Sequence, residues 1–257
     1  MTSAAPLLSV RDVTVRFGGL FANSNISFDV PEGALFAVIG PNGAGKTTLF
    51  NVISGAFPPT EGKISFAGEN ITGQPLAKNA ARGLIRTYQL VQLFKDLSVA
   101  ENVQVGAHRV TKGGVFAALA RPGSFKTQEA EVRAEALRLL DFVGLGGRGD
   151  VQADKLPYGQ QRLLEVARAL AAKPRIILLD EPAAGLNTEE TAALAEVIKK
   201  INATGVTVLL IEHDMSLVMK VAQRIAVLDF GKKIAEGTPD EVRRHPDVLA
   251  AYLGGTE

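Results

Sequence analysis

Residues 40–47 combine glycines with a lysine and a threonine at a spacing that suits phosphate binding. They read GPNGAGKT and match the pattern G-x-x-x-x-G-K-[ST] at every fixed position. An apolar run over 34–39 precedes this loop, and a helical pattern starts at Thr47. The glycines let successive backbone N–H groups curl around phosphate oxygens, and the helix adds the positive end of its dipole.

The lysine and the threonine of this loop have distinct expected roles. Lys46 would reach the β- and γ-phosphates of a nucleotide, and the Thr47 hydroxyl would ligate magnesium. A glycine-rich turn that binds nothing is the alternative, and the strand and helix around the loop favour the phosphate site. The residues expected to bind the nucleotide here are Gly40, Pro41, Asn42, Gly43, Ala44, Gly45, Lys46, Thr47 and Thr48.

Two adjacent carboxylates end a second apolar run. Residues 176–181 read IILLDE. Asp180, at the end of the strand, is suited to hold magnesium through water, and Glu181 can polarise the attacking water. Two acids after a strand are by themselves usually part of a solvated loop. Together with the phosphate loop they favour hydrolysis of a nucleoside triphosphate, which many ATPases and GTPases share.

The runs that position these groups predict an α/β fold. Short apolar runs rich in β-branched residues recur at 34–39, 176–179, 206–211 and 225–228, with helical patterns between several of them. Such runs are typical of a buried, largely parallel sheet. The opening segment alternates more and predicts an antiparallel side sheet. Its apolar positions are Leu8, Val10, Val13, Val15, Ile26, Phe28 and Val30.

The middle of the chain predicts helices. Residues 125–143 carry apolar side chains at helical spacing among charges, and Gly144 suits a helix end. We therefore expect a helical insert at roughly 90–160 inside the α/β core.

Composition narrows the class of protein. The chain has 257 residues, 46% hydrophobic content, no cysteine and a formal net charge of +1. The lack of cysteine excludes disulfides, thiolate metal sites and a cysteine nucleophile, and the charge argues against nucleic-acid binding. The N-terminal residues lack the features of a signal peptide, and the strongly apolar runs fall short of the ~18 residues that cross a bilayer. We therefore expect a cytoplasmic protein that acts on a membrane through partners.

A third motif lies between the phosphate loop and the acids. Residues 156–162 read LPYGQQR and lead into an amphipathic helical pattern. This motif resembles the signature of ABC ATPases, usually L-S-G-G-Q. The resemblance covers essentially the whole chain and implies an α/β fold, a P-loop NTPase (ABC-type ATPase) core with an antiparallel β side sheet and a helical subdomain insert. It also implies ATP and Mg2+ as ligands, and a second ABC ATPase subunit whose phosphate loop faces this signature.

The resemblance implies a division within one ABC ATPase domain over 1–257. The α/β nucleotide-binding core would comprise 1–89 and 161–240. The helical subdomain would comprise 90–160, and a C-terminal tail would follow at 241–257.

The signature departs from the family pattern at two positions. Pro157 stands where the family usually has serine, and Tyr158 where it has glycine. Because proline has neither a hydroxyl nor an N–H, contact with the partner's γ-phosphate would fall to Gly159, Gln160 and the helix dipole. Tyr158, Gly159 and Gln160 are the nucleotide contacts that we expect here, and a tight turn before a helix is the structural alternative.

Further positions match elements of the family in the expected order. Phe17 resembles the aromatic residue that stacks on adenine, Gln89 the glutamine that touches magnesium or the attacking water, and His213 the histidine that contacts the γ-phosphate. Their alternatives are a core aromatic, a surface glutamine and a structural histidine. Asn187 replaces an aspartate in the loop that crosses to the partner, and with Glu190 it also suits a helix cap.

The catalytic and metal-binding sets follow from these matches. The expected catalytic residues are Glu181, His213, Gln89 and Lys46, and the expected magnesium contacts are Thr47, Gln89 and Asp180.

Several segments resemble the ATPases of branched-chain amino acid importers, namely 86–103, 158–162, 181–187, 211–215 and 251–254. The resemblance implies a hetero- or homodimer of ATPase subunits, two integral membrane permease subunits, a periplasmic binding protein contacted indirectly, and no nucleic acid. It implies a peripheral position on the cytoplasmic face of the inner membrane. Import of urea or other amides, export of lipopolysaccharide or lipoprotein, and a non-transport ABC ATPase are the alternatives.

The apolar residues of 89–97 suggest a contact with the membrane subunit. Leu90, Leu93, Phe94 and Leu97 would line a groove that takes a helix of that subunit, and filling the core is the alternative.

Overall fold

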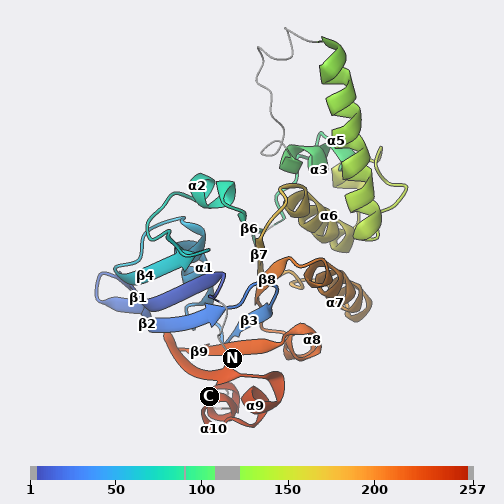
Figure 1. The fold of residues 1–257 in the computed structure, drawn as a ribbon. Helices are drawn as coiled ribbons and strands as arrows, with labels where there is room; N and C mark the ends of the chain where they lie inside the picture. The colour runs from blue at the N-terminus through green and yellow to red at the C-terminus, as the bar shows by residue number, and fades with distance from the viewer. Residues whose placement is uncertain (1–4, 90, 108–121, 254–257) are drawn as a thin grey trace. The chain divides into compact units, whose positions relative to one another are not determined.

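The structure, a computed structural model, describes residues 5–89, 91–107 and 122–253. The chain divides into two compact units, and most of their elements are labelled in Figure 1. The core unit comprises Met1–Arg86, Arg175–Ala184 and Thr191–Glu257. The helical unit comprises Thr87–Pro174 and Gly185–Glu190.

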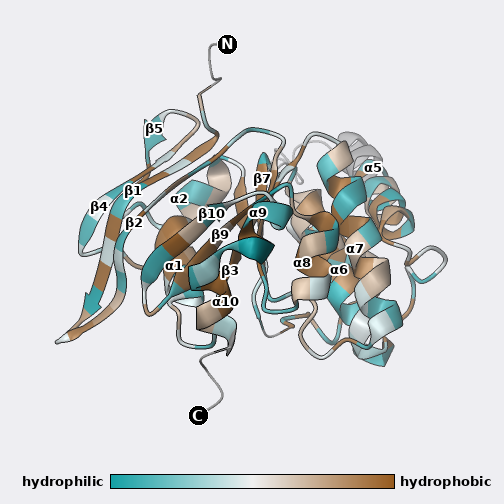
Figure 2. Cartoon of the chain, turned by 90° about the horizontal axis from the view of Figure 1, so that it is seen from below, coloured by the Kyte–Doolittle hydropathy of each residue, from teal (hydrophilic) through white to brown (hydrophobic). Residues whose placement is uncertain are grey.

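The larger sheet of the core unit has the strand order β10-β9-β3-β8-β7-β6. All neighbouring pairs in it are parallel except β9 and β10, so the predicted largely parallel sheet is confirmed. Strands β3, β7 and β8 are buried along their whole length, and β3 and β7 carry hydrophobic colours in Figure 2. The strands are β3 (Leu35–Ile39), β6 (Leu84–Arg86), β7 (Ile176–Asp180), β8 (Thr207–Ile211), β9 (Arg224–Asp229) and β10 (Lys232–Gly237).

The smaller sheet of the core unit is antiparallel and has the order β2-β1-β4-β5. This confirms the predicted side sheet at the start of the chain. Its strands are β1 (Leu8–Phe17), β2 (Leu20–Val30), β4 (Glu61–Phe66) and β5 (Glu69–Asn70).

The helices of the core unit connect and flank these strands. Asp214 caps α8 by accepting the N–H of Ser216, and Thr238 and Glu241 form a capping box on α9. The helices are α1 (Lys46–Ser54), α2 (Leu76–Ala81), α8 (Met215–Val221), α9 (Pro239–Arg244) and α10 (Pro246–Leu253), together with most of α7 (Thr188–Ala203).

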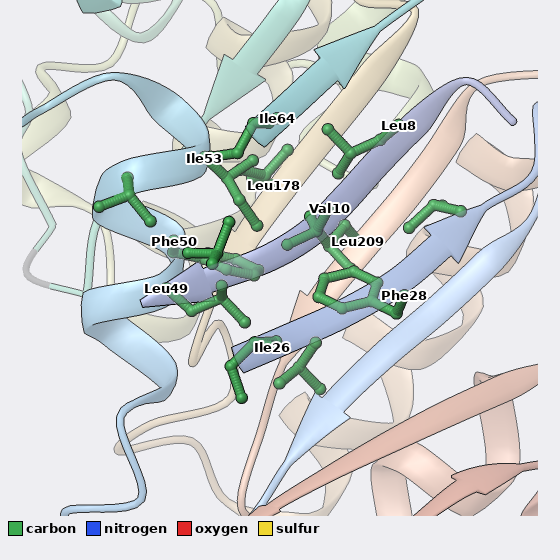
Figure 3. Close-up of a cluster of buried hydrophobic side chains, with 14 of the residues drawn as sticks. Leu8, Val10, Ile26, Phe28, Leu49, Phe50, Ile53, Ile64, Leu178 and Leu209 are labelled. Atoms are coloured by element: carbon green, nitrogen blue, oxygen red, sulfur yellow. The ribbon is translucent and has the colours of Figure 1, made fainter. Parts of the chain in front are cut away.

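The hydrophobic core of this unit joins both sheets to α1. Figure 3 shows Leu178 and Leu209 of the parallel sheet beside Phe50 of α1 and Phe28 of the antiparallel sheet. Phe28 also stacks on Phe36 of β3, with ring centroids 5.4 Å apart. The burial of these apolar faces holds the start of α1 against the ends of the parallel strands.

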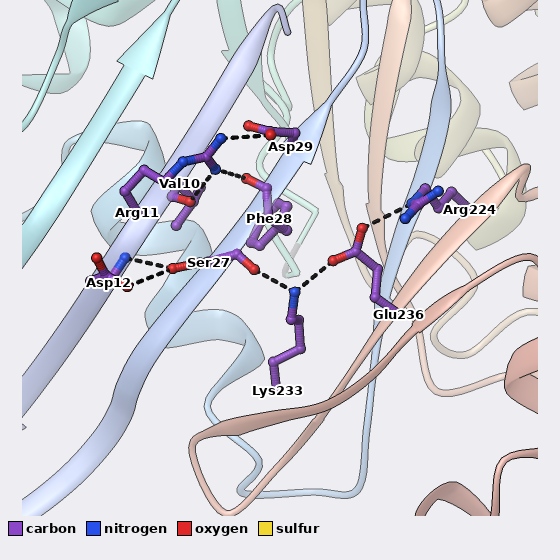
Figure 4. Close-up of polar contacts among 9 residues, drawn as sticks. All are labelled: Val10, Arg11, Asp12, Ser27, Phe28, Asp29, Arg224, Lys233 and Glu236. Carbon is purple, nitrogen blue, oxygen red and sulfur yellow. Dashed lines mark hydrogen bonds and ion pairs between the residues drawn. The ribbon is translucent and has the colours of Figure 1, made fainter. Parts of the chain in front are cut away.

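Polar contacts tie the antiparallel sheet to the hairpin of β9 and β10 (Figure 4). The Lys233 ammonium donates to the Ser27 carbonyl at 2.6 Å and pairs with Glu236 at 2.6 Å. Glu236 also accepts from Arg224 of β9 at 2.8 Å. The hairpin is therefore joined to β2 by a side-chain hydrogen bond, that of Lys233.

The helical unit is built on α3 (Val99–Ala107), α5 (Pro122–Phe142) and α6 (Tyr158–Ala171), which contact one another, with the short 3-10 helix η1 (Ala153–Lys155) between α5 and α6. The helix predicted over 125–143 is confirmed as α5, and Gly144 follows it with a φ of +86°. Among the described residues, none of the helices combines the length and apolar character that crossing a bilayer demands.

Candidate nucleotide site

The loop over 40–45 connects the end of β3 to the start of α1. Gly40 has a φ of +151° and Gly45 a φ of +92°, in the region that favours glycine. A Cβ at Gly40 would overlap the carbonyl oxygen of Leu228, and one at Gly45 would overlap the carbonyl oxygen of Ala22. The close approach of two strands therefore requires glycine at both positions.

Lys46 is the first residue of α1, and its side chain folds back onto this loop. Its buried ammonium donates to the carbonyls of Gly40 at 2.7 Å and Pro41 at 2.9 Å. Burial lowers the pKa of Lys46, and the nearby carboxylates of Glu181 and Asp180 oppose that shift. The charge is thus held where a polyanion in the loop would meet it.

A hollow of about 460 Å³ opens beside the loop. It is lined by residues 42–48, by Glu181, and by Leu20, Phe21, Ala22 and Phe230. Thr47, expected to ligate magnesium, is exposed, and Thr48 is half-buried. The hollow thus combines the residues predicted to bind phosphate with apolar side chains.

Phe17 lies at the end of β1 with its side chain 54% exposed. Its ring meets Phe57 edge to face, with centroids 5.9 Å apart. The interpretation of Phe17 as a core aromatic is therefore wrong, and its stacking on adenine stays a prediction.

Asp180 and Arg86 form a buried ion pair at the ends of neighbouring strands. The Arg86 Nη2 lies 2.6 Å from the Asp180 Oδ2, and its Nη1 donates to Asn51 at 2.8 Å and Ser54 at 3.1 Å, both on α1. Burial raises the pKa of Asp180, and the hydrogen bond from Arg86 opposes this. Sequence reasoning missed Arg86 as a site residue, although it is a charged residue at the end of the short strand β6.

Glu181 has a strained backbone, with a φ of +45°. Its N–H donates to the carbonyl of Ile211 at 3.0 Å, which ties the turn after β7 to the end of β8. The His213 Nδ1 lies 3.9 Å from the Glu181 Oε2. The structure therefore brings these two predicted catalytic side chains together at one edge of the sheet.

Glu212 is a buried carboxylate that sequence reasoning missed. It accepts the N–H of Ala183 at 2.8 Å and that of His213 at 3.1 Å. Burial raises the pKa of Glu212, and these backbone donors oppose the shift. Its signal in the sequence is an acid directly after the apolar run of β8, as Asp180 ends that of β7. It connects the turn of Glu181 to the turn of His213.

The fit of this site to magnesium can be judged from the oxygen atoms present. Within the described part of the chain, the buried Asp180 Oδ1 accepts no hydrogen bond, and the Thr47 hydroxyl belongs to the exposed side of the loop. No cluster of three acidic, histidine or cysteine side chains suited to a metal occurs among the described residues. Magnesium commonly takes one or two protein oxygens together with substrate phosphates. The residues present fit that mode.

The signature residues lie at the start of α6 in the helical unit. Pro157 takes the N-cap position, Tyr158 is half-exposed, and Gly159 is buried where a Cβ would overlap the Glu190 carboxylate. Asn187 and Glu190 exchange backbone-to-side-chain hydrogen bonds of 3.0 and 2.9 Å, which confirms the helix cap. Gln160 is half-buried in this helical turn.

Gln89 also belongs to the helical unit, where it is exposed. Two residues of the matched sequence segments, Leu90 and Gly254, lie outside the described residues.

Comparisons with known proteins decide the family. The model of the family described as ABC transporter matches residues 23–184. The chain belongs to this family. As an ABC ATPase it binds nucleotide and hydrolyses ATP, so the predicted fold and enzyme class are confirmed. A second model, described as branched-chain amino acid ATP-binding cassette transporter, matches residues 232–257.

This ABC ATPase is similar along its whole length to curated relatives. It is 44% identical to the high-affinity branched-chain amino acid transport ATP-binding protein LivG of Salmonella typhimurium, covering 97% of this chain and 98% of LivG. It is 46% identical to the high-affinity branched-chain amino acid transport ATP-binding protein BraF of Pseudomonas aeruginosa, with the same coverage.

Solved structures agree in fold with this ABC ATPase. An ATP-binding cassette of an ABC transporter in its ADP conformation superposes with a TM-score of 0.85 at 31% identity, covering 98% of this chain and 100% of that one. A dimeric cassette in a post-hydrolysis state bound to ADP and Pi gives a TM-score of 0.76 at 27% identity, covering 90% and 98%.

Replacing Arg86 with methionine should destabilise the protein strongly. The change leaves the Asp180 carboxylate buried without its ion-pair partner, which costs about 3–5 kcal/mol in comparable pairs. The measurement is the free energy of unfolding from denaturant titration. As a control, Arg82→Met removes the largely exposed pair with Glu69 and should cost less than about 1 kcal/mol. The double variant Arg86→Met/Asp180→Asn should recover much of the loss. Equal stability of Arg86→Met and wild type would contradict the assigned role of this pair.

Proposed function

We propose that this ABC ATPase powers the import of branched-chain amino acids. The observation that carries the proposal is the 44–46% identity to LivG and BraF over nearly the entire chain. The match of the branched-chain cassette model to 232–257 supports it independently, because this region lies outside the part matched by the general ABC model.

We propose the following partners for this subunit. It pairs with a second ABC ATPase subunit, of the same or a different kind, and acts on two integral membrane permease subunits that receive cargo from a periplasmic binding protein. The dimeric cassette among the solved structures supports the pairing, and the transport names of the relatives support the permeases. With these partners, the proposed location of the subunit is the cytoplasmic face of the inner membrane.

We propose that the division of labour between domains follows the family pattern. The expected division is a nucleotide-binding core of 1–89 and 161–240, a helical subdomain of 90–160 and a tail of 241–257. The compact units differ from these bounds, because residues 87–89 and 161–174 group with the helical unit.

In the proposed mechanism, the phosphate loop and Lys46 bind the triphosphate, and Phe17 packs on the base. Thr47 and Asp180, with Gln89, hold magnesium, which when bound neutralises charge on the phosphate oxygens. Glu181 takes a proton from the attacking water, and His213 stabilises the transferred phosphoryl charge. The strained backbone of Glu181 and its 3.9 Å separation from His213 support these roles.

The signature motif acts on the partner's nucleotide in this proposal. Because Pro157 has no N–H and occupies the N-cap, the contact falls to Tyr158, Gly159, Gln160 and the positive end of α6.

The cargo is tested by ATP hydrolysis in membranes. The complex, reconstituted with its permeases and binding protein, is supplied with leucine, isoleucine, valine, urea or no ligand. The proposal expects stimulation by the branched-chain amino acids and none by urea. Stimulation by urea alone, or by none of these with basal hydrolysis intact, would instead favour another cargo.

Glu181→Gln should abolish turnover while nucleotide binding persists. An amide cannot accept the proton of the attacking water, so ATP stays bound and the closed dimer accumulates. Size-exclusion chromatography in the presence of ATP measures the fraction of dimer, and the rate of phosphate release measures turnover. Full turnover by this variant would show that Glu181 is not the base.

Phe94→Asp should weaken assembly with the permeases. The Phe94 side chain is 49% exposed, between half-buried Leu93 and exposed Lys95, so its apolar surface is available to a partner helix. The measurements are complex formation and permease-stimulated ATPase activity, with Leu249→Asp on α10 as a control of similar exposure. Survival of both properties in Phe94→Asp would disprove the groove.

A further inference from the structure

The segment that follows β6 is bound by buried side chains of α6. One arm of the Arg162 guanidinium donates to the Tyr88 carbonyl at 3.1 Å, and the other donates to the next carbonyl, that of Gln89. The N–H of Gln92 donates to the Glu165 carboxylate at 3.1 Å. Side chains of one helix face therefore satisfy three backbone groups of this segment.

The far end of the same segment is bound by α3. The buried Asn102 amide accepts the N–H of Phe94 at 3.0 Å and donates to the carbonyl of Phe94 at 2.9 Å and that of Ser98 at 3.0 Å. The Arg168 guanidinium of α6 lies over the Phe94 ring, 5.8 Å from its centroid. All of these residues belong to the helical unit.

The residues of α6 in this network form a buried charge pair. Arg162 and Glu165 are both almost fully buried, with Nη1 and Oε2 3.4 Å apart. Burial raises the pKa of Glu165, and the Gln92 N–H and Arg162 oppose this. Buried charges are costly unless they are paired and hydrogen-bonded. The segment makes three hydrogen bonds to this pair, while the Arg162 Nε has no hydrogen-bond partner among the described residues. Segment and helix therefore stabilise each other.

The same helix carries the signature residues. Gly159 precedes Arg162 by three residues, which is close to one helical turn, so the signature and the guanidinium belong to successive turns of α6. Closely packed, hydrogen-bonded elements move together rather than deform independently. A displacement of residues 88–89 and 91–94 would therefore reach the start of α6 through Arg162 and Glu165.

We propose that Arg162, supported by Glu165, is a positioning residue that couples the membrane-subunit contact to the signature motif. This rests on the proposed function, in which the segment meets the permease and the signature meets the partner's nucleotide. Arginine suits the position because its planar fork spans two consecutive carbonyls, whereas a lysine ammonium is a single point of charge. Arg162 acts through Gln89 and α6 and touches no reacting atom.

The test compares Arg162→Lys and the uncharged pair Arg162→Met/Glu165→Gln with wild type. Arg162→Lys removes the paired hydrogen bonds to the Tyr88 and Gln89 carbonyls. Because it keeps a positive charge beside Glu165, the variant should still fold. The control is Arg133→Met, which removes the exposed pair of Arg133 with Asp150 in the same unit. The first readout is amide hydrogen exchange of the peptide over 88–97 in the isolated full chain. The second is ATPase activity of the reconstituted complex, with and without leucine-loaded binding protein.

For Arg162→Lys, we expect at least fivefold faster exchange at 88–92. We also expect at least a fivefold loss of stimulation relative to each variant's own basal rate, with the ATP affinity of the isolated chain within twofold of wild type. The double variant should show larger changes in the same direction, and Arg133→Met none. Unchanged exchange, or full stimulation in Arg162→Lys despite faster exchange, would overturn the proposal.

If wild type itself shows no stimulation by leucine, the proposed cargo fails. In that case stimulation by assembly with the permeases, relative to the isolated chain, replaces the leucine readout, and its survival in Arg162→Lys overturns the coupling.

Discussion

The close approach of two strands to the phosphate loop is the constraint on which the nucleotide site depends. The carbonyl oxygens of Leu228 and Ala22 take the space that side chains at Gly40 and Gly45 would need. Only a glycine backbone can pass there with the positive φ angles observed. That passage aims the first turn of α1 at the hollow and folds Lys46 back onto the loop carbonyls. The dipole of α1 and the lysine charge therefore act on the same small volume.

The opposite charges at this site come from the ends of neighbouring parallel strands. β7 ends at Asp180 and β8 ends just before Glu212, and their register places Asp180 beside Ile211. Such an edge gathers groups from distant parts of the chain, because the carboxyl ends of parallel strands meet there. Arg86 and Lys46 compensate the buried carboxylates in charge. This edge of the sheet thus also holds a buried ion pair, Arg86–Asp180, that contributes to folding.

Local patterns in the sequence were sufficient for the main features of the fold and for much of the candidate site. Alternation and β-branched runs predicted both sheets, because burial on one or two faces of a strand imposes its own periodicity. The phosphate loop and the acids after β7 were predicted because their chemistry is local. The Arg86–Asp180 pair joins residues 94 positions apart, and the Glu212 bonds reach across a separate turn. No local spacing records such partners, so sequence reasoning missed them. The sequence does not decide whether Phe17 stacks on adenine or fills the core, because one aromatic at a strand end has no periodic signal of exposure.

If the tightly packed glycine loop forms the nucleotide site, a side chain at Gly45 should weaken ATP binding, whereas one at Gly205 should not. The measurement compares ATP binding by Gly45→Ala and Gly205→Ala. The two glycines have nearly equal φ values, +92° and +91°, but a Cβ meets Ala22 at Gly45 and open space at Gly205. ATP affinity is measured by isothermal titration calorimetry on variants shown to be folded by circular dichroism. Because both alanines strain the backbone but only the one at Gly45 clashes with a neighbouring strand, the comparison separates the two effects. We expect Gly205→Ala to bind ATP with wild-type affinity. We expect Gly45→Ala to lose about 100-fold in ATP affinity, equivalent to about 2.7 kcal/mol of binding free energy. Wild-type affinity in Gly45→Ala would contradict it.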